Sequence, residues 1–215
     1  MKLKNLIILT SIFFFLGAGN PDSGKDKVAV CAGCHGIDGN SVVGIWPSLA
    51  GQNEKYLAKQ LRLVKSGDRV IASMAGILDN LDDSDLQDIA AYYATLQHKV
   101  GQADESKVEL GRKLYYAGNL EKGIPACSAC HSPKGLGNAP AAYPLLSGQQ
   151  PDYISKALKD YRSGERVNED PSKIMAAIAY KLDDKEIDAL SSFVHGLSLI
   201  HISEPTRLRR ISYAV

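Results

Sequence analysis

The sequence predicts an all-α protein built from two tandem, homologous domains. Three observations lead to this fold class. A motif of two cysteines and a histidine occurs twice, the residues after it recur at a nearly constant offset, and apolar residues return at helical three-four spacing. No useful length of the chain alternates between apolar and polar residues as a half-buried strand would.

The repeated motif is C-x-x-C-H. It reads Cys-Ala-Gly-Cys-His at 31–35 and Cys-Ser-Ala-Cys-His at 127–131, and these copies contain all four cysteines of the chain. The pattern is typical of covalent attachment of c-type haem, in which two thiols bond to the porphyrin and the histidine ligates the iron. We therefore predict two covalently bound haem c groups.

Other interpretations of the cysteines are weaker. A zinc site would have to bring both cysteine pairs to one metal and would leave the histidines unexplained. A thioredoxin-like dithiol follows a β-strand, and no strand-like run precedes either motif. Structural disulfides do not explain why a histidine directly follows each pair.

The chain repeats itself beyond the motif. Ten residues between Pro47 and Arg69 recur 97 positions later, between Pro144 and Arg166, and Leu-Asp-Asp at 81–83 returns 101 positions later at 182–184. Four extra residues are therefore expected around 168–172. The repeat predicts an N-terminal domain at 20–103 and a C-terminal domain at 104–197. Domains of this size bury limited surface alone, so a bound porphyrin would supply much of each core.

The periodicity places the main helices of each half. We expect helices at 53–66 and 84–96 in the first half, with Asn53 as the N-cap, and at 152–161 and 184–197 in the second. A helix at 108–116 precedes the second motif, whereas its counterpart before Cys31 is less clear. Gly- and Pro-rich stretches at 36–47 and 133–144 are expected to form loops around the haem edges.

Methionines are the candidates for the sixth iron ligand. Apart from Met1, the chain has only Met74 and Met175, and each lies between the two main helices of its half. A methionine more often fills a gap in a core, but equivalent positions in a haem repeat favour axial ligation through sulfur. His98 and His195 are rival ligands, and they do not correspond under the 101-residue offset.

Both ends of the chain are expected to lie outside the two domains. Residues 1–19 combine Lys2 and Lys4, an apolar run and small residues, as in a secretory signal peptide, which predicts export to the periplasm. Residues 198–215 have no partner in the first half. The stretch from Leu197 to Arg207 looks like the translation of a transposase sequencing adaptor, so we interpret 198–215 as a non-native, disordered tail.

Removing these ends changes the charge. The full chain has 25 basic and 24 acidic residues, a formal charge of +1. Without the basic residues of both ends and Glu204, 20 basic and 23 acidic residues remain, which gives −3 before the haem propionates are counted. This balance argues against a nucleic-acid partner.

The motifs together resemble the dihaem cytochrome c4 family. Its likeness rests on Cys-Ala-Gly-Cys-His-Gly, Pro-Ser-Leu-Ala-Gly-Gln and Lys-Ser-Gly-Asp-Arg, and covers about 25–197. The resemblance implies two class I cytochrome c domains related by a pseudo-twofold axis, and electron transfer in the periplasm. It implies these cofactor-binding residues: Cys31, Cys34, Cys127 and Cys130 as thioethers, His35 and His131 as proximal ligands, and Met74 and Met175 as distal ligands.

Three functions agree with these motifs. The first, which the family resemblance implies, is a dihaem carrier that moves single electrons between a quinol-oxidising complex and a haem-copper oxidase. The second is an electron-accepting subunit of a periplasmic dehydrogenase. The third, a dihaem peroxidase, is disfavoured because the two halves offer matching sites instead of one open iron. A further hypothesis is peripheral association with the membrane.

Overall fold

The computed structural model describes residues 18–167 and 170–198. The described chain is helical, with isolated β-bridges at Asn119–Ile124 and Asn138–Tyr143 and no strand. Residues 1–17 of the expected signal peptide lie outside the described residues. Residues 199–215 of the expected tail also lie outside them. None of the described helices is long and apolar enough to cross a membrane.

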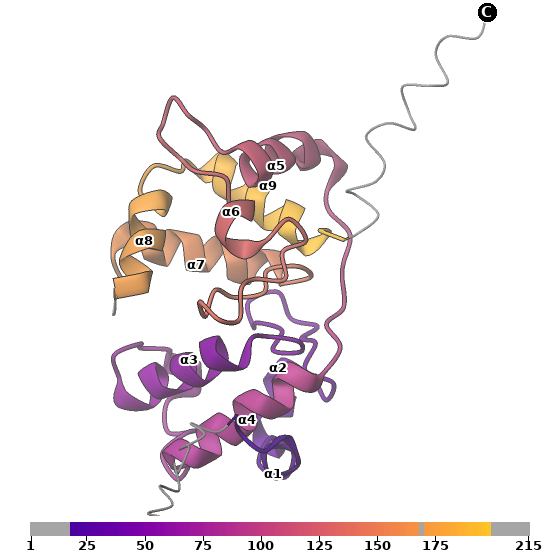
Figure 1. Cartoon of the computed structure of the whole chain (residues 1–215), viewed down its shortest axis with the longest axis vertical. Helices are drawn as coiled ribbons and strands as arrows, with labels where there is room; N and C mark the ends of the chain where they lie inside the picture. Colours follow the sequence, from indigo (N-terminus) through magenta and orange to yellow (C-terminus); the bar gives the residue numbers. More distant parts are fainter. Residues whose placement is uncertain (1–17, 168–169, 199–215) are drawn as a thin grey trace, which may run out of the picture.

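The first half of the chain forms one helical domain, in the lower part of Figure 1. Its last helix is central, because both the first and the third helix pack against it. A core of buried apolar residues that includes Leu57, Leu86, Ile89 and Tyr93 fills the space between them. The elements are α1 (Pro21–Lys25), α2 (Ala29–His35), α3 (Glu54–Ser66), the 3₁₀ helix η1 (Ala72–Met74) and α4 (Asp83–Thr95).

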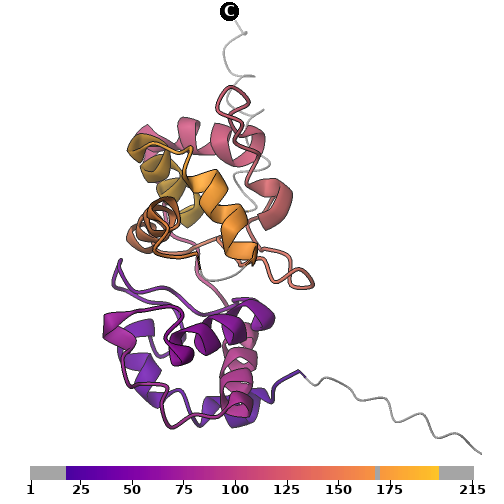
Figure 2. The same cartoon turned by 90° about the vertical axis from the view of Figure 1, so that its left-hand side faces the viewer.

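The second half repeats this arrangement. The last helix again packs against the first and third helices, around a core that includes Tyr115, Ile187 and Phe193. The elements are α5 (Glu105–Ala117), α6 (Ser128–His131), α7 (Pro151–Ser163), α8 (Asp170–Ala179) and α9 (Asp184–His195). Figure 2 shows the two domains stacked along the long axis of the molecule, with one chain crossing between α4 and α5.

Helix starts and ends follow the repeat. Asp82 and Asp183 each begin the last helix of their domain with a capping box, which satisfies backbone N–H groups that have no partner inside the helix. Gly67 and Gly164 end α3 and α7 in the left-handed conformation, with φ of +81° and +86°. A residue without Cβ adopts this conformation at little cost.

The structure corrects one expected cap. Asn53 stands at the N-cap position of α3, but its side chain makes no capping hydrogen bond. Its amide instead donates to the carbonyl of Tyr143 in the other domain. A contact between domains has replaced the local bond that sequence alone predicts.

The helix before the first motif, which periodicity did not define, is α1. It begins at Pro21 after the N-cap Asn20 and ends at Lys25, so it has 5 residues. It packs on α4 as α5 packs on α9. The two halves thus share the same crossing of first and last helices, although the first helix of the N-terminal domain spans little more than one turn.

Candidate haem sites and the domain interface

Each cysteine motif lies on a short helix that ends at its histidine. Cys31, Cys34 and His35 lie on α2, and Cys130 and His131 lie on α6, which Cys127 begins. No disulfide joins any of the four cysteines in the described structure. Burial raises the pKa of Cys31 and raises that of Cys127 to about 11.

The two histidines are held in the same way. The Nδ1 atom of His35 lies 2.8 Å from the carbonyl oxygen of Pro47, and that of His131 lies 3.0 Å from the carbonyl oxygen of Pro144. Both rings are buried, and burial lowers the pKa of each imidazole. A neutral ring that donates from Nδ1 has its Nε2 lone pair free for a metal.

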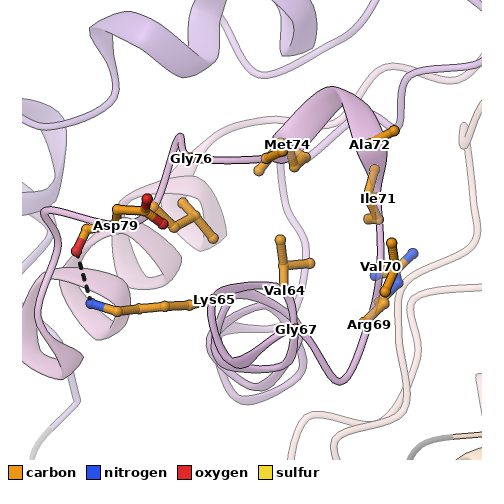
Figure 3. A pocket seen from close by; sticks show the side chains of 12 residues that line it. Val64, Lys65, Gly67, Arg69, Val70, Ile71, Ala72, Met74, Gly76 and Asp79 are labelled. Carbon is orange, nitrogen blue, oxygen red and sulfur yellow. Dashed lines mark hydrogen bonds between the residues drawn. The ribbon is translucent and has the colours of Figure 1, made fainter.

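Met74 lies on η1, beside a cavity of about 210 Å³. Figure 3 shows this cavity between Val64 at the end of α3, the chain from Arg69 to Ala72, and Met74. Met74 and Cys31 both pack against the N-terminal core. The structure therefore brings Met74 and the first motif to the same core, as ligands of one group would require.

Met175 has a different local setting. It is half-buried on α8, a full helix that packs against α7, where the first domain has only the single turn η1. The expected insertion around 168–172 precedes or begins this helix, and its residues 168 and 169 lie outside the described chain. The additional residues thus accompany a longer element at the second methionine.

The rival histidines have different partners: His98 contacts the other domain, whereas His195 contacts a residue of its own domain. Nε2 of His98 is 3.4 Å from the hydroxyl of Ser147, and Nδ1 of His195 is 3.0 Å from the carbonyl oxygen of Gln149. Both side chains are half-buried. Neither lies on a motif helix, and both have structural partners.

Two glutamines join the domains reciprocally. Oε1 of Gln149 accepts a hydrogen bond from the backbone N–H of Ser48 at 2.8 Å, and its Nε2 donates to the carbonyl of Ser48 at 2.8 Å. Gln52 makes the same pair with Leu145, at 2.9 and 3.1 Å. In the sequence these glutamines stand out only as repeated positions. The repeat of Gly-Gln was the signal, but nothing local indicated a partner in the other domain.

Arginines and tyrosines cross the interface in a second reciprocal pair. Arg166 donates to the hydroxyl of Tyr56 at 2.8 Å, and Arg69 donates to the hydroxyl of Tyr153 at 3.3 Å. Burial opposes ionisation of Tyr56 and raises its pKa to about 12. Among the described residues, no aspartate or glutamate forms an ion pair with either arginine.

The comparisons with known proteins agree with this geometry. A family model described as cytochrome c matches residues 22–97 and 108–198. Over 197 residues the chain is 46% identical to cytochrome c4 of Pseudomonas aeruginosa, covering 88% of this chain and 98% of that relative. The chain belongs to the dihaem cytochrome c4 family.

Structural similarity extends over both domains of the cytochrome. The crystal structure of reduced recombinant cytochrome c4 from Pseudomonas stutzeri matches with a TM-score of 0.81 and 46% identity, covering 84% of this chain and 100% of that chain. A more distant relative is the thiosulfate dehydrogenase electron acceptor of Thiomonas intermedia, 34% identical over 173 residues and covering 78% of each chain. The predicted fold, two tandem class I cytochrome c domains, is confirmed.

Membership in the cytochrome c4 family establishes the cofactors and the broad activity. The protein is a dihaem c-type cytochrome with two covalently bound haem c groups, and it is an electron carrier instead of an enzyme. The peroxidase hypothesis is therefore set aside.

The residues present fit two such groups. Each motif places two cysteines that form no disulfide beside a buried histidine whose Nδ1 already has a partner. The charge of the interface fits as well. Arg166 is only 6% exposed, and no carboxylate among the side chains that the structure describes forms an ion pair with it. A buried guanidinium without a negative partner is costly. Carboxylates such as haem propionates would neutralise the positive charges of Arg69 and Arg166.

Proposed function

We propose that this cytochrome carries single electrons between respiratory partners in the periplasm, toward a terminal oxidase. In this proposal His35 and Met74 ligate one iron, and His131 and Met175 ligate the other. Cys31, Cys34, Cys127 and Cys130 form the thioether bonds. The observation that carries the proposal is the mirrored support of the two histidines by Pro47 and Pro144.

The protein residues have distinct tasks in such a carrier. Bound haem supplies reversible one-electron exchange at the iron. The Pro47 and Pro144 carbonyls orient the imidazoles and select the tautomer that leaves Nε2 free. A thioether from Met74 or Met175 is a soft ligand that favours ferrous iron and raises the potential. With one histidine and one methionine of this chain on each iron, no position would remain for oxygen or peroxide.

The partners belong to the proposal and not to the family assignment. We expect a quinol-oxidising complex as donor and a haem-copper oxidase as acceptor, at a membrane surface that the protein reaches peripherally. The domains carry a formal charge of −3 once the two ends are excluded. Docking must therefore depend on local patches instead of a strong overall charge.

One observation favours a second candidate. The Thiomonas intermedia relative is named a thiosulfate dehydrogenase electron acceptor. The same fold in our chain would serve as the electron-accepting subunit of a periplasmic dehydrogenase. Purification from the native source separates the two candidates, because a subunit remains bound to its dehydrogenase through size-exclusion chromatography and a free carrier does not.

The ligand assignment is tested by Met74→His and Met175→His. Each change should remove the weak red-edge absorption band that a thioether gives to ferric haem, and should lower the potential of that haem alone, because imidazole lacks the preference for ferrous iron. Absorption spectroscopy of the oxidised protein and redox titration provide the measurements.

Controls distinguish ligand loss from general damage. His98→Gln should leave both axial spectra unchanged, since His98 contacts Ser147 instead of a motif helix. The reduced unmutated protein should bind little carbon monoxide, while Met74→Ala should open one iron to it. Unchanged potentials in both histidine variants, or stoichiometric carbon monoxide binding by the unmutated protein, would show that the assignment is wrong.

A further inference from the structure

The carbonyls that hold the two histidines belong to peptide groups that also contact the other domain. The Pro47–Ser48 peptide accepts from Nδ1 of His35 at its oxygen, at 2.8 Å. Its N–H, that of Ser48, donates to Oε1 of Gln149 at 2.8 Å. One peptide thus lies between the histidine of one domain and the glutamine of the other.

The second domain has the same arrangement in reverse. The Pro144–Leu145 peptide accepts from Nδ1 of His131 at 3.0 Å, and its N–H donates to Oε1 of Gln52 at 2.9 Å. Gln52 and Gln149 occupy equivalent positions in the repeat, 97 residues apart. The two chains of hydrogen bonds are therefore related by the pseudo-twofold arrangement of the domains.

Hydrogen bonds to both the oxygen and the nitrogen fix the orientation of each glutamine amide. Each Oε1 also accepts from the N–H of the next residue, Asn53 or Gln150, at 2.9 Å. Each Nε2 faces a carbonyl oxygen of the other domain, so exchanging oxygen and nitrogen would break every one of these bonds. Gln52 and Gln149 are each 4% exposed, which keeps water from competing.

Hydrogen bonds linked through one peptide strengthen one another. The peptide is conjugated, so an acceptor at its N–H makes its oxygen a better acceptor. A better acceptor at Nδ1 makes the imidazole more basic toward a metal at Nε2. A more basic ligand stabilises ferric iron and lowers the potential of that haem.

We propose that Gln149 tunes the haem held by His35, and that Gln52 tunes the haem held by His131, each across the domain interface. Both act as positioning residues through a proline carbonyl. The inference rests on the proposed ligands His35 and His131. It links the association of the domains to their potentials, because separating the domains removes both outer acceptors together.

Gln149→Met and Gln52→Met test this crossed dependence in the full, haem-loaded protein. Methionine has a similar length but no amide oxygen. Redox titration, followed by NMR with haem methyl resonances assigned to each domain, measures both potentials. Gln149→Met should raise the potential of the N-terminal haem more than that of the C-terminal haem, and Gln52→Met should do the opposite.

The chain offers matched controls. Gln150 donates to the carbonyl of Ser41 and Asn53 donates to that of Tyr143, so both also cross the interface. Neither touches a peptide that holds a histidine. Gln150→Met and Asn53→Leu should therefore weaken domain contact without a crossed shift in potential.

A second measurement follows the histidines directly. The NMR signal of the His35 Nδ1 proton should move upfield in Gln149→Met and stay in place in Gln52→Met. If the methionine variants do not fold, Gln149→Asn and Gln52→Asn retain an amide that is too short to reach, and should give the same crossed pattern. Shifts confined to the same domain, equal in both haems, or no larger than the controls would overturn the inference.

Failure of the ligand assignment has a different signature. A wrong proximal ligand would leave the low-spin haem spectrum intact after His35→Ala. If the present inference fails, the glutamine variants should keep normal ligand spectra. Neither variant would then shift the potential of the haem in the other domain more than that of the haem in its own domain. The two outcomes are therefore distinguishable.

Discussion

Gly111 lets α5 cross α9 in backbone contact. A Cβ atom at this position would lie 2.5 Å from the carbonyl oxygen of Ala189 and 2.5 Å from Cβ of Phe193. Gly24 has the same role on α1, where a Cβ would lie 2.1 Å from the carbonyl oxygen of Asp88. Asp88 and Ala189 are 101 positions apart, so both domains use glycine at the equivalent crossing.

Gly111→Ala should destabilise the C-terminal domain by about 1–3 kcal/mol, because the clash is with backbone that cannot rotate away. Denaturant unfolding of the haem-loaded protein, followed by circular dichroism, measures the loss. Gly33→Ala is the control, since a Cβ there meets nothing within 4 Å and the second motif already has Ala129 at that place. Equal stability of the two variants would contradict the close crossing.

The beginning of α9 depends on charge as well as on capping. Asp183 accepts from the N–H of Glu186 at 2.9 Å, and Lys122 bonds to Asp183 at 2.9 Å and to Glu186 at 2.8 Å. The bond from Lys122, followed by that from the Glu186 backbone, holds the pKa of Asp183 below its ordinary value of 3.8. A carboxyl with a lowered folded-state pKa stabilises the fold above its unfolded-state value.

Asp183→Asn should therefore make the free energy of unfolding less dependent on pH at acidic pH. The contribution of Asp183 is complete above about pH 4 and is lost as the pH falls through its lower folded-state value. Asparagine still caps a helix but cannot ionise. Urea unfolding between about pH 2 and 7 provides the test, with Glu121→Gln as the control for removing an exposed charge. A profile parallel to that of the unmutated protein would refute the role of Asp183.

The two domains are held together by reciprocal contacts. A residue of one domain contacts the other domain, and the equivalent residue of the other domain contacts the first. Gln52 and Gln149 each accept a hydrogen bond from a backbone N–H of the other domain. Arg69 and Arg166 each donate to a tyrosine hydroxyl of the other domain. The reciprocity is not complete, because Gln60 accepts from both arginines and its counterpart is Ala157. Arg166 also lies over the ring of Tyr161, at 4.7 Å from its centre.

A double-mutant cycle on Arg166→Met and Tyr56→Phe should show that this interface couples the domains. The two changes should be non-additive by about 0.5–3 kcal/mol, as expected for groups in one buried network. Thermal unfolding with the haems bound measures each corner of the cycle. The exposed pair Arg112 and Glu109 is the control, and its coupling should stay below about 1 kcal/mol. Additive effects of Arg166 and Tyr56 would contradict a buried network.

The sequence by itself determined the features that depend on near neighbours. The cysteine motifs and the repeat can be recognised directly along the chain. The main helices follow from three-four periodicity of apolar residues, which involves only near neighbours. The all-α fold and the two haem c groups followed from these features, and the family assignment confirms both. The individual iron ligands remain predictions.

Only the tertiary structure decided which groups meet across the interface. Asn53 donates to Tyr143 instead of capping α3, and Met175 lies on a full helix where Met74 lies on one turn. The weakly patterned α1 is held by α4, since so short a helix has little stability of its own. Gln52 and Gln149 find partners 93 and 101 residues away. Such contacts depend on how folded domains associate, and no local pattern in a chain encodes that geometry.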